Sequence, residues 1–383
     1  GVAAALGLGV ADRVRSSLPR LDGAVAVEGV QHPVRVERDE LGVVTISGGS
    51  RRDVAFATGF VHAQDRFFQM DLMRRRAAGE LAELFGAGAL ESDRAVRIHR
   101  FRDIARRSYE SDPRRDLLDA YADGVNAGLA DLGAPPAEYV LPARKVAPWR
   151  GEDSFLVLLS MFMVLTDGDG STESAVGLVH DLLPPRLAAF LTPRGTEWDA
   201  PVVDAPLPTP RVPGPEVVDL RSARSVITPP EAGAPEPPAL PGSNSWAVAG
   251  DHTTHGGAIL ANDMHLGLRV PNTWYRAQLH YPAANGTDVV ITGVTLPGSP
   301  IVAVGSNGSV AWGYTNSYGD FSDLVVLEPD PASPERYLTP TGARAFETFT
   351  EEIAVRGGEP EPLEVRWTIW GPVLDRDHRG RER

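Results

Sequence analysis

The sequence predicts an α+β fold in which a mainly helical part precedes a part built of short strands. Between residues 52 and 191, apolar residues recur every three or four positions, which is typical of amphipathic helices. After Ser243 the pattern changes to short alternating or β-branched runs separated by turn residues, which is typical of antiparallel strands. A proline-rich segment separates the two parts, so we divide the chain into residues 1–204, 205–242 and 243–383.

Within the first part, residues 24–30, 34–40 and 42–48 predict three strands before the helices begin. From Arg52 the helical spacing predicts a long helix that is capped by Asp53 and ends at Gly86. Further helices are predicted over residues 115–133, 151–168 and 171–191. In the last part, strands are predicted over 245–250, 257–263, 273–282, 288–298, 300–306, 309–317, 323–330 and 363–370.

The segment 205–242 differs from the rest of the chain in composition. It holds eleven of the 33 prolines and few aromatic residues. Such a segment buries too little apolar surface to order itself. A linker between domains and a spacer that is cut out both fit this composition, which does not choose between them.

Composition and missing motifs exclude several classes of protein. The formal net charge of −14 argues against nucleic acid as the main partner. The absence of cysteine excludes disulfides, thiolate nucleophiles and zinc sites that use cysteine. The sequence has no G-x-S-x-G, H-E-x-x-H, P-loop or G-x-G-x-x-G motif. An EF-hand calcium loop starting at Asp167 is excluded, because its twelfth position is Leu178 where the loop needs a glutamate.

Both ends of the sequence suggest a longer precursor. The chain opens with about ten apolar residues, too few to span a bilayer but typical of the end of a signal peptide or anchor. We therefore expect export, with the protein periplasmic or secreted, and no stable membrane span. The last residues continue a strand pattern and then a charged run, so we expect this chain to be a fragment.

Ser243 stands at the start of the strand-rich part, in "LPGSNSWAVAG", and no histidine lies within eight residues of it. A serine hydroxyl needs a base to accept its proton. If the chain is cut just before Ser243, the new α-amine has an ordinary pKa of about 7.7–8 and can serve as that base. Gly242 suits such a cut, because it has no Cβ and tolerates backbone strain.

Three blocks of sequence carry a resemblance to a known family. They are "HPVRVERDELGVVTI…AFATGFVHAQDRFFQMDLMRR", "GSNSWAVAG…GGAILANDMHLGLRVPNTWYRAQLHYP" and "GSNGSVAWGYTNSYGDFSDL". In this order, they resemble the penicillin amidase (penicillin acylase) family of N-terminal-nucleophile hydrolases. The resemblance runs from about Val27 to the last residue, and the proline-rich segment lies where that family has its excised spacer.

The resemblance implies an αββα sandwich with two packed antiparallel sheets. It also implies a precursor that cuts itself between Gly242 and Ser243 and becomes a heterodimer of an α chain and a β chain. The mature enzyme would hydrolyse an amide that links an acyl group to an amine. Ser243 would be the nucleophile, its α-amine the base, and an acyl-enzyme the intermediate.

Further site residues are implied by the same match. The backbone N–H of Asn316 would donate to the oxyanion, together with an asparagine side chain that the family carries beyond the position of Arg383. His265 would lie beside the nucleophile, as in the cephalosporin acylases, although a structural hydrogen bond within the sheet also explains it. His62 is expected to be a packing residue.

The acyl pocket would be walled by four residues that are aliphatic or acidic, where the penicillin G branch often has aromatic residues. This difference favours linear acyl chains or other amides over a phenylacetyl group, and each residue also fits a core position or a solvated turn. The four are Met163, Asp167, Leu266 and Val304.

A structural calcium ion is implied by matched oxygen ligands, which are the kind that calcium prefers. They are Glu173, Asp320, Asp323 and the backbone carbonyl of Ser322. A solvated acidic turn is the alternative.

Two rival functions remain open at this stage. The first is an inactive homologue that acts as a binding protein stabilised by calcium. The second is a conventional serine hydrolase that uses His265 as its only base.

Overall fold

The computed structural model describes residues 11–140, 146–166, 170–195, 198, 201, 203, 208–219, 242–316, 319 and 321–383. The chain divides into two compact units, which are described separately. Unit 1 comprises residues 1–166, 241–318 and 347–367, and unit 2 comprises residues 167–240, 319–346 and 368–383. Helices dominate before the proline-rich segment and strands after it, so the predicted mixed α+β class is confirmed.

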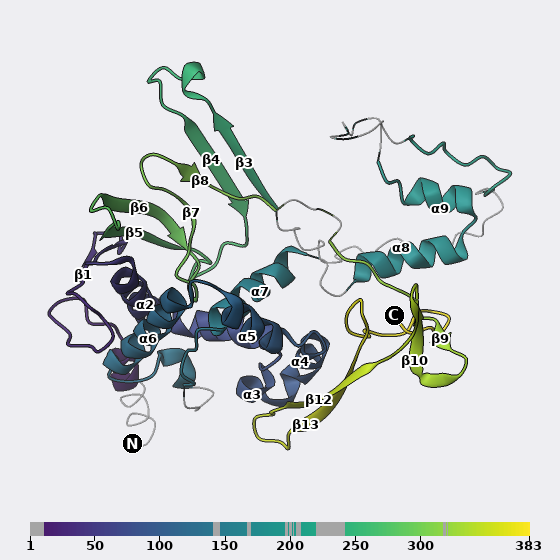
Figure 1. The fold of residues 1–383 in the computed structure, drawn as a ribbon, viewed down its shortest axis with the longest axis horizontal. Helices are drawn as coiled ribbons and strands as arrows, with labels where there is room; N and C mark the ends of the chain where they lie inside the picture. Colours follow the sequence, from purple (N-terminus) through teal and green to yellow (C-terminus); the bar gives the residue numbers. More distant parts are fainter. Residues whose placement is uncertain are drawn as a thin grey trace. The chain divides into compact units, whose positions relative to one another are not determined.

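The helices of unit 1 come first in the chain (Figure 1). They are α2 (Arg51–Ala78), α3 (Ala82–Phe85), α4 (Leu90–Arg97), α5 (Phe101–Ser111), α6 (Arg115–Asp131) and α7 (Asp153–Leu165), with short 3₁₀ turns at Gly86–Ala89 and Ala137–Val140.

A six-stranded sheet in the order β1-β2-β5-β6-β7-β8 forms the other layer of unit 1. Its strands are β1 (Arg35–Arg38), β2 (Val44–Ser47), β5 (Tyr275–Pro282), β6 (Asp288–Thr295), β7 (Val302–Ser306) and β8 (Ala311–Trp312). The pairing is antiparallel except between β2 and β5, which run parallel. Parallel neighbours need a long connection, and here the helices lie between these two strands in the sequence. The predicted antiparallel character therefore holds for four of the five pairings.

Two hairpins complete the strands of unit 1. One pairs β3 (Gly242–Val248) with β4 (Ile259–His265), and the other pairs β12 (Glu347–Ile353) with β13 (Glu361–Trp367). The predicted strand over 363–370 therefore ends three residues early.

Unit 2 contains two helices and a small sheet. The helices are α8 (Ser171–Leu182) and α9 (Pro185–Leu191), which are separate because Pro184 and Pro185 interrupt the predicted continuous helix. The sheet has the order β11-β10-β9 and uses Pro329–Asp330 for β9, Ser333–Thr339 for β10 and Gly342–Ala345 for β11. The strand predicted over 323–330 is thus confined to its last two residues.

Helix α2 differs from its prediction at both ends. Its N-cap is Ser50, whose hydroxyl accepts a hydrogen bond from the backbone N–H of Asp53. Its C-cap is Gly79, which has a left-handed backbone (φ 65°) that other residues rarely adopt. Asp53 is therefore inside the first turn, and the predicted end at Gly86 belongs to the short helix α3.

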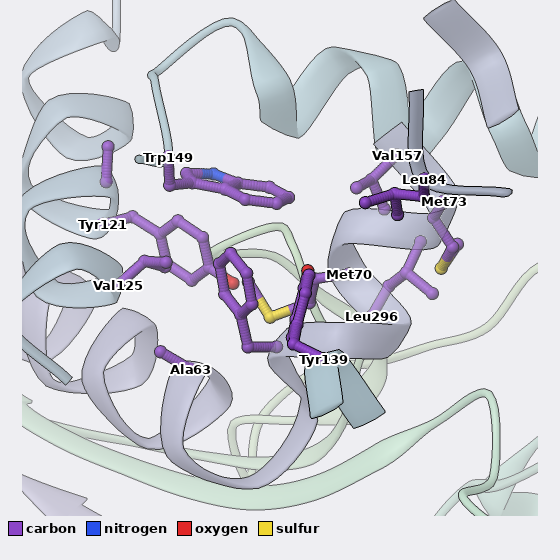
Figure 2. Packing of buried hydrophobic residues seen from close by; sticks show 12 residues of the cluster. Ala63, Met70, Met73, Leu84, Tyr121, Val125, Tyr139, Trp149, Val157 and Leu296 are labelled. Carbon is purple, nitrogen blue, oxygen red and sulfur yellow. The ribbon is translucent and has the colours of Figure 1, made fainter. Parts of the chain in front are cut away.

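Helices α2 and α6 cross at a close approach that glycines permit. A Cβ atom on Gly59 would lie 2.1 Å from the carbonyl oxygen of Tyr121, and one on Gly124 would lie 1.9 Å from that of Phe56. Neither position has room for a side chain. Around this crossing, α2, α6 and α7 form a buried cluster that includes Tyr121, Trp149 and Val157 (Figure 2).

The same helix α2 packs on the six-stranded sheet through a second buried cluster. It brings Val54, Ala57 and Val61 of α2 against Ile46 of β2 and Leu279 of β5, among others. Residues 24–30, which were predicted as a strand, form none. Val27 and Val30 instead pack against a cluster that includes Phe56, so their apolar character reflects helix contacts and not sheet pairing.

A buried ion-pair network joins α2 to α7. The Asp71 carboxylate accepts hydrogen bonds from Nε of Arg74 (2.7 Å) and Nε of Arg75 (2.9 Å), and from the hydroxyl of Tyr139. Arg74 also donates to Asp153, the first residue of α7, at 2.6 Å. Burial would raise the pKa of Asp71, but the two guanidinium groups outweigh it and lower the pKa, so the carboxylate is charged at neutral pH.

Replacing Asp71 with alanine should lower the free energy of unfolding by about 3 kcal/mol, because Arg74 and Arg75 would be left buried without this carboxylate. Denaturant unfolding of the full-length protein would measure the change. The exposed Asp39 provides a control, since Asp39→Ala removes a carboxylate that caps only a surface turn. Equal losses for the two variants would contradict the role of the network.

Within the described residues, no helix is long and apolar enough to cross a membrane.

Candidate active site

Ser243 lies at the beginning of strand β3, one residue after Gly242 and partly buried. The antiparallel register of the β3–β4 hairpin places Gly242 opposite His265 and Ser243 opposite Met264. The change to strand pattern at Ser243 is therefore the start of a hairpin whose second strand ends at the histidine. The predicted strand 245–250 starts three residues too late, because Gly242, Ser243 and Asn244 also pair with β4.

Two groups from one segment contact the Ser243 hydroxyl. The backbone N–H of Asn316 donates to the Oγ atom at 2.7 Å, and Oγ donates to the hydroxyl of Thr315 at 3.0 Å. The predicted donor and the predicted nucleophile are thus adjacent, although 73 positions separate them. In the uncut chain, this N–H contacts the serine oxygen itself.

Two side-chain amides hold the segment that carries Asn316. Its own Nδ2 donates to the carbonyl oxygen of Leu165, the last residue of α7, at 3.0 Å. Nδ2 of Asn262 donates to the carbonyl oxygens of Tyr314 (2.9 Å) and Asn244 (3.1 Å). Asn262 thereby joins β4, β3 and the segment before Asn316. Neither Thr315 nor Asn262 was predicted to be a site residue, although both lie inside the three blocks of sequence that resemble the family.

His265 lies beside the junction between Gly242 and Ser243. Its Nε2 atom is 3.0 Å from the carboxylate of Asp263 and 3.4 Å from Nδ2 of Asn244. The carboxylate can only accept a hydrogen bond, so this contact requires a proton on Nε2. Nδ1 lies 3.4 Å from the position that a Cβ on Gly242 would take. The hydrogen-bond partners of the Ser243 hydroxyl, in contrast, are Thr315 and Asn316.

Three of the four predicted acyl-pocket residues lie in the described part of the chain. Met163 is partly buried near the end of α7, two residues before the carbonyl that Asn316 contacts. Leu266 directly follows His265, and Val304 pairs with Val294 inside the six-stranded sheet. Asp167 lies outside the described residues. Met163 and Leu266 are thus close in sequence to residues that contact the Ser243 region, but these positions do not define a pocket.

The predicted calcium ligands belong to unit 2. Glu173 lies in the first turn of α8, while Ser322 and Asp323 precede Leu324; Asp320 lies outside the described residues. A Cβ on Gly170, the N-cap of α8, would lie 3.0 Å from the side chain of Leu324. Glu173 and Leu324 also line one cavity of about 380 Å³. The segment with Asp323 therefore lies close to the start of α8, and the oxygen donors fit calcium in kind.

A different cluster in unit 2 has the residue types of a metal site. In the part of the chain that the structure describes, it is the one group of three potential ligands within 4.8 Å, and it consists of Asp181, Asp377 and His378. Asp181 already pairs with Arg381 (2.9 Å) and Arg379 (3.4 Å). Two guanidinium groups on one carboxylate disfavour a bound cation, so we interpret this cluster as an ion-pair network.

His62 is a core residue, as predicted. It is fully buried, with one ring nitrogen 2.8 Å from the hydroxyl of Tyr121 and the other 2.9 Å from that of Thr295. Burial lowers the pKa of His62 to about 3, with Arg66 adding to the effect, so the ring is neutral. It holds α2, α6 and β6 together and is remote from the hydrogen-bond partners of Ser243.

A serine at the start of a strand, with a glycine before it and a backbone N–H on its hydroxyl, is the arrangement expected of an N-terminal-nucleophile hydrolase. The chain belongs to the penicillin amidase family, because a sequence model described as penicillin amidase matches residues 33–382.

Curated relatives support this assignment. The chain is 33% identical to "Penicillin acylase 2 proenzyme" of a Pseudomonas species over 380 residues, which are 96% of this chain and 46% of that protein. It is 32% identical to "Acyl-homoserine lactone acylase QuiP" of Pseudomonas aeruginosa, covering 98% of this chain and 45% of that protein. The identity with penicillin G acylase of Escherichia coli is 25%, over 94% and 47% of the two chains. The chain thus spans about half the length of these relatives.

A solved structure, a thermostable penicillin G acylase from Alcaligenes faecalis in its tetragonal form, also matches. It is 25% identical, with a TM-score of 0.39, and the match covers 46% of this chain and 99% of the solved chain.

Proposed function

We propose that the protein carrying this chain is a self-processing acylase, which cuts itself before Ser243 and then uses Ser243 to hydrolyse an amide between an acyl group and an amine. The observation that carries the proposal is the 2.7 Å contact from the Asn316 N–H to the Ser243 hydroxyl, at a serine directly preceded by glycine. Intact-mass measurement and N-terminal sequencing of the purified full-length product test it. The second mature chain should begin Ser-Asn-Ser-Trp.

In the proposed self-cleavage, Oγ of Ser243 bonds to the carbonyl carbon of Gly242, and the bond from that carbon to the nitrogen of Ser243 breaks. The proton leaves Oγ and ends on this nitrogen. Water then hydrolyses the ester, which gives a carboxylate on Gly242 and restores the serine hydroxyl. The new amine has an ordinary pKa of about 7.7–8 and is the base of the mature enzyme.

In the proposed turnover, the amine accepts the Ser243 proton while Oγ attacks the amide carbonyl of the substrate. The Asn316 N–H then donates to the oxygen that becomes negative, and such an aimed donor is typically worth about 3 kcal/mol. An acyl-enzyme forms as the amine product leaves, and water releases the acid. The family's second donor, an asparagine further along the β chain, would complete the oxyanion site.

The proposed substrate is an N-acyl amide with a linear acyl chain. The names of two relatives, a penicillin acylase and an acyl-homoserine lactone acylase, both denote removal of an acyl group from an amine. By the family match, the aliphatic residues Met163, Leu266 and Val304 would form an apolar wall for the acyl group, and Asp167 is the fourth residue of the predicted set. Comparing kcat/KM for a straight-chain acyl amide and a phenylacetyl amide tests this, and a preference for phenylacetyl would contradict it.

A conventional serine hydrolase is the second candidate, and one observation favours it. Nδ1 of His265 lies 3.4 Å from the position that a Cβ on Gly242 would take, and its Nε2 contacts the Asp263 carboxylate. It contacts the junction and not the serine hydroxyl, so we rank it below the amine as the base for turnover. A protein that is uncut and active would reverse this ranking.

We also propose a structural calcium ion held by Glu173, Asp320, Asp323 and the carbonyl of Ser322. The close approach of Leu324 to Gly170 supports this, since it brings Asp323 near the start of α8. The ion would neutralise mutually repelling carboxylates and stabilise unit 2. None of its four ligands is proposed for catalysis, so we assign the ion a structural role only.

Chelation should therefore lower the melting temperature of the full-length protein, since calcium at a hundredfold above its Kd would contribute about 3 kcal/mol. The Asp323→Ala variant should lose most of this response. Asp181→Ala is the matched control, because Asp181 lies in the same unit but pairs with arginines. Differential scanning calorimetry with and without chelator measures both, and an unchanged wild-type transition would rule the site out.

Three further proposals follow from the family. The protein is exported to the periplasm or secreted, which cell fractionation tests.

Residues 1–204 and 243 onward form an αβ heterodimer after residues 205–242 leave, which mass spectrometry of the two chains tests. The six-stranded sheet with α2 on it is one half of an αββα sandwich, and a crystal structure of the full-length protein without a second packed sheet would refute this.

A further inference from the structure

We propose that the hydroxyl of Thr315 is a positioning group, which holds the Ser243 Oγ atom in one rotamer while the Asn316 N–H turns to the carbonyl oxygen under attack. This inference rests on the proposed function and adds a residue to its site.

Thr315 contacts Ser243 at two points. Its Oγ1 atom accepts a hydrogen bond from the serine hydroxyl at 3.0 Å and lies 3.0 Å from the carbonyl oxygen of the same serine. The carbonyl of Asn316, at 3.1 Å, is an alternative acceptor. A hydroxyl has one proton, so it donates to one of these carbonyls while it accepts from Ser243. When it donates to the Ser243 carbonyl, a single group links the side chain and the main chain of Ser243, which opposes rotation about χ1.

The contact between Thr315 and Oγ is needed because the Asn316 N–H cannot serve both the Ser243 hydroxyl and the oxyanion. In the uncut chain, that N–H is used by the Ser243 hydroxyl at 2.7 Å. An oxyanion donor acts only if it points to the oxygen on which negative charge develops. When the N–H turns to that oxygen, Ser243 loses one of its two hydrogen bonds. The contact with Thr315 then remains to keep Oγ directed, because the Thr315 hydroxyl can turn its own proton to Oγ as the Ser243 proton passes to nitrogen.

The Thr315 hydroxyl has no role as the base. A neutral hydroxyl takes up a proton only far below neutral pH, and the Ser243 proton must end on nitrogen in the cleavage step. The balance of that step is therefore unchanged by Thr315. Its contribution is to the fraction of time that Oγ spends in the attacking orientation.

The segment with Thr315 is anchored without its hydroxyl. Asn262 Nδ2 bonds the carbonyls of Tyr314 and Asn244, and so joins this segment to the strand of Ser243. At Gly313, a Cβ would lie 2.9 Å from the Cβ of Asn262, so the backbone passes directly over that side chain. Removing the hydroxyl of Thr315 should leave the segment in place and change only the hold on Oγ.

The test compares two matched pairs at position 315 in the full-length protein. Thr315→Val removes the hydroxyl at nearly constant shape, and Thr315→Ser keeps the hydroxyl but removes the methyl; Thr315→Ala then repeats the removal at the smaller size. Self-cleavage is followed over time by mass spectrometry, and kcat and KM are measured on the mature enzyme with an N-acyl amide. Loss of one neutral hydrogen bond should slow both self-cleavage and kcat by roughly five- to tenfold.

We expect the Val and Ala variants to be slow, the Ser variant to remain within about twofold of wild type, and KM to change little in all three, because positioning acts on the reacting state. A Val variant as fast as wild type would overturn the inference. So would a Ser variant as slow as Val, because the methyl group would then be responsible, or a loss confined to KM. Failure of the proposed function is distinct, since the wild-type protein itself would then neither cut nor hydrolyse amides.

Discussion

Ser243→Ala should leave the full-length precursor uncut and without amide-hydrolysing activity. The alanine lacks the oxygen that attacks the Gly242 carbonyl and that the Asn316 N–H contacts. Loss of a nucleophile commonly costs about a millionfold in kcat, so both effects should reach the detection limit. Intact mass reports the cleavage, and release of amine from an N-acyl substrate reports the turnover.

Ser245→Ala is the matched control for this experiment. Ser245 lies two residues on in β3, on the same face of the strand, and pairs with Asn262 across the hairpin. Its replacement should leave cleavage and turnover close to wild type. If Ser243→Ala were still cut at the same bond, the nucleophile assignment would be wrong. Cleavage of the wild type without amide hydrolysis would instead favour the inactive binding homologue.

Blocking the amine of Ser243 should abolish turnover while the protein stays folded. The segment from Ser243 onward is produced separately with one alanine before the serine and combined with the preceding segment; the control begins at Ser243 itself. The extra residue keeps the hydroxyl but converts the amine to an amide, which takes up no proton near neutral pH. We expect activity to fall at least about a hundredfold, the usual contribution of a general base. Circular dichroism checks that both forms fold alike.

The pH profile of the control tests the same point. An amine is a base only when it has lost its proton, so activity should fall as the pH decreases through its pKa. Burial disfavours the charged amine and lowers this pKa, which places the acidic limb at or below about 7.7–8. His265→Gln should retain measurable turnover. If the blocked form were active and His265→Gln inactive, the base would be the histidine, and the conventional hydrolase would replace our proposal.

The site could be predicted from sequence where a function requires a particular residue in a particular local motif. Ser243 and Asn316 were both predicted as site residues from the resemblance, and the structure places the Asn316 N–H 2.7 Å from the Ser243 hydroxyl, although the strand predicted over 309–317 is confined to Ala311–Trp312 and does not include Asn316. Thr315 and Asn262 were missed, because a hydroxyl or an amide has no local pattern that indicates a distant partner. The roles of the calcium and acyl-pocket residues stay predictions.

The fold was predicted correctly for several helices, but not for the ends of α2 or for one strand. The spacing of apolar residues predicted α2, α6 and α7, because the residues on one face of a helix recur every three or four positions in the sequence. Both predicted ends of α2 were wrong. The helix begins after Ser50, whose hydroxyl accepts a hydrogen bond from the N–H of Asp53, and it ends at the left-handed Gly79 instead of Gly86. The strand predicted over 24–30 was wrong, because its apolar residues pack on helices.

The sequence by itself determined the α+β class, the helical part before the strand-rich part, and a serine directly after a glycine at the start of a strand. Only the tertiary structure decided which residues meet there. The β3–β4 register placed His265 against Gly242, and the hydrogen bonds of Asn262 and Asn316 brought Thr315 to the serine hydroxyl. The physical reason is the range of each effect. Secondary-structure propensity and hydrophobic periodicity depend on a few neighbouring residues. Strand register and the hydrogen bonds of side-chain amides join residues that are tens of positions apart.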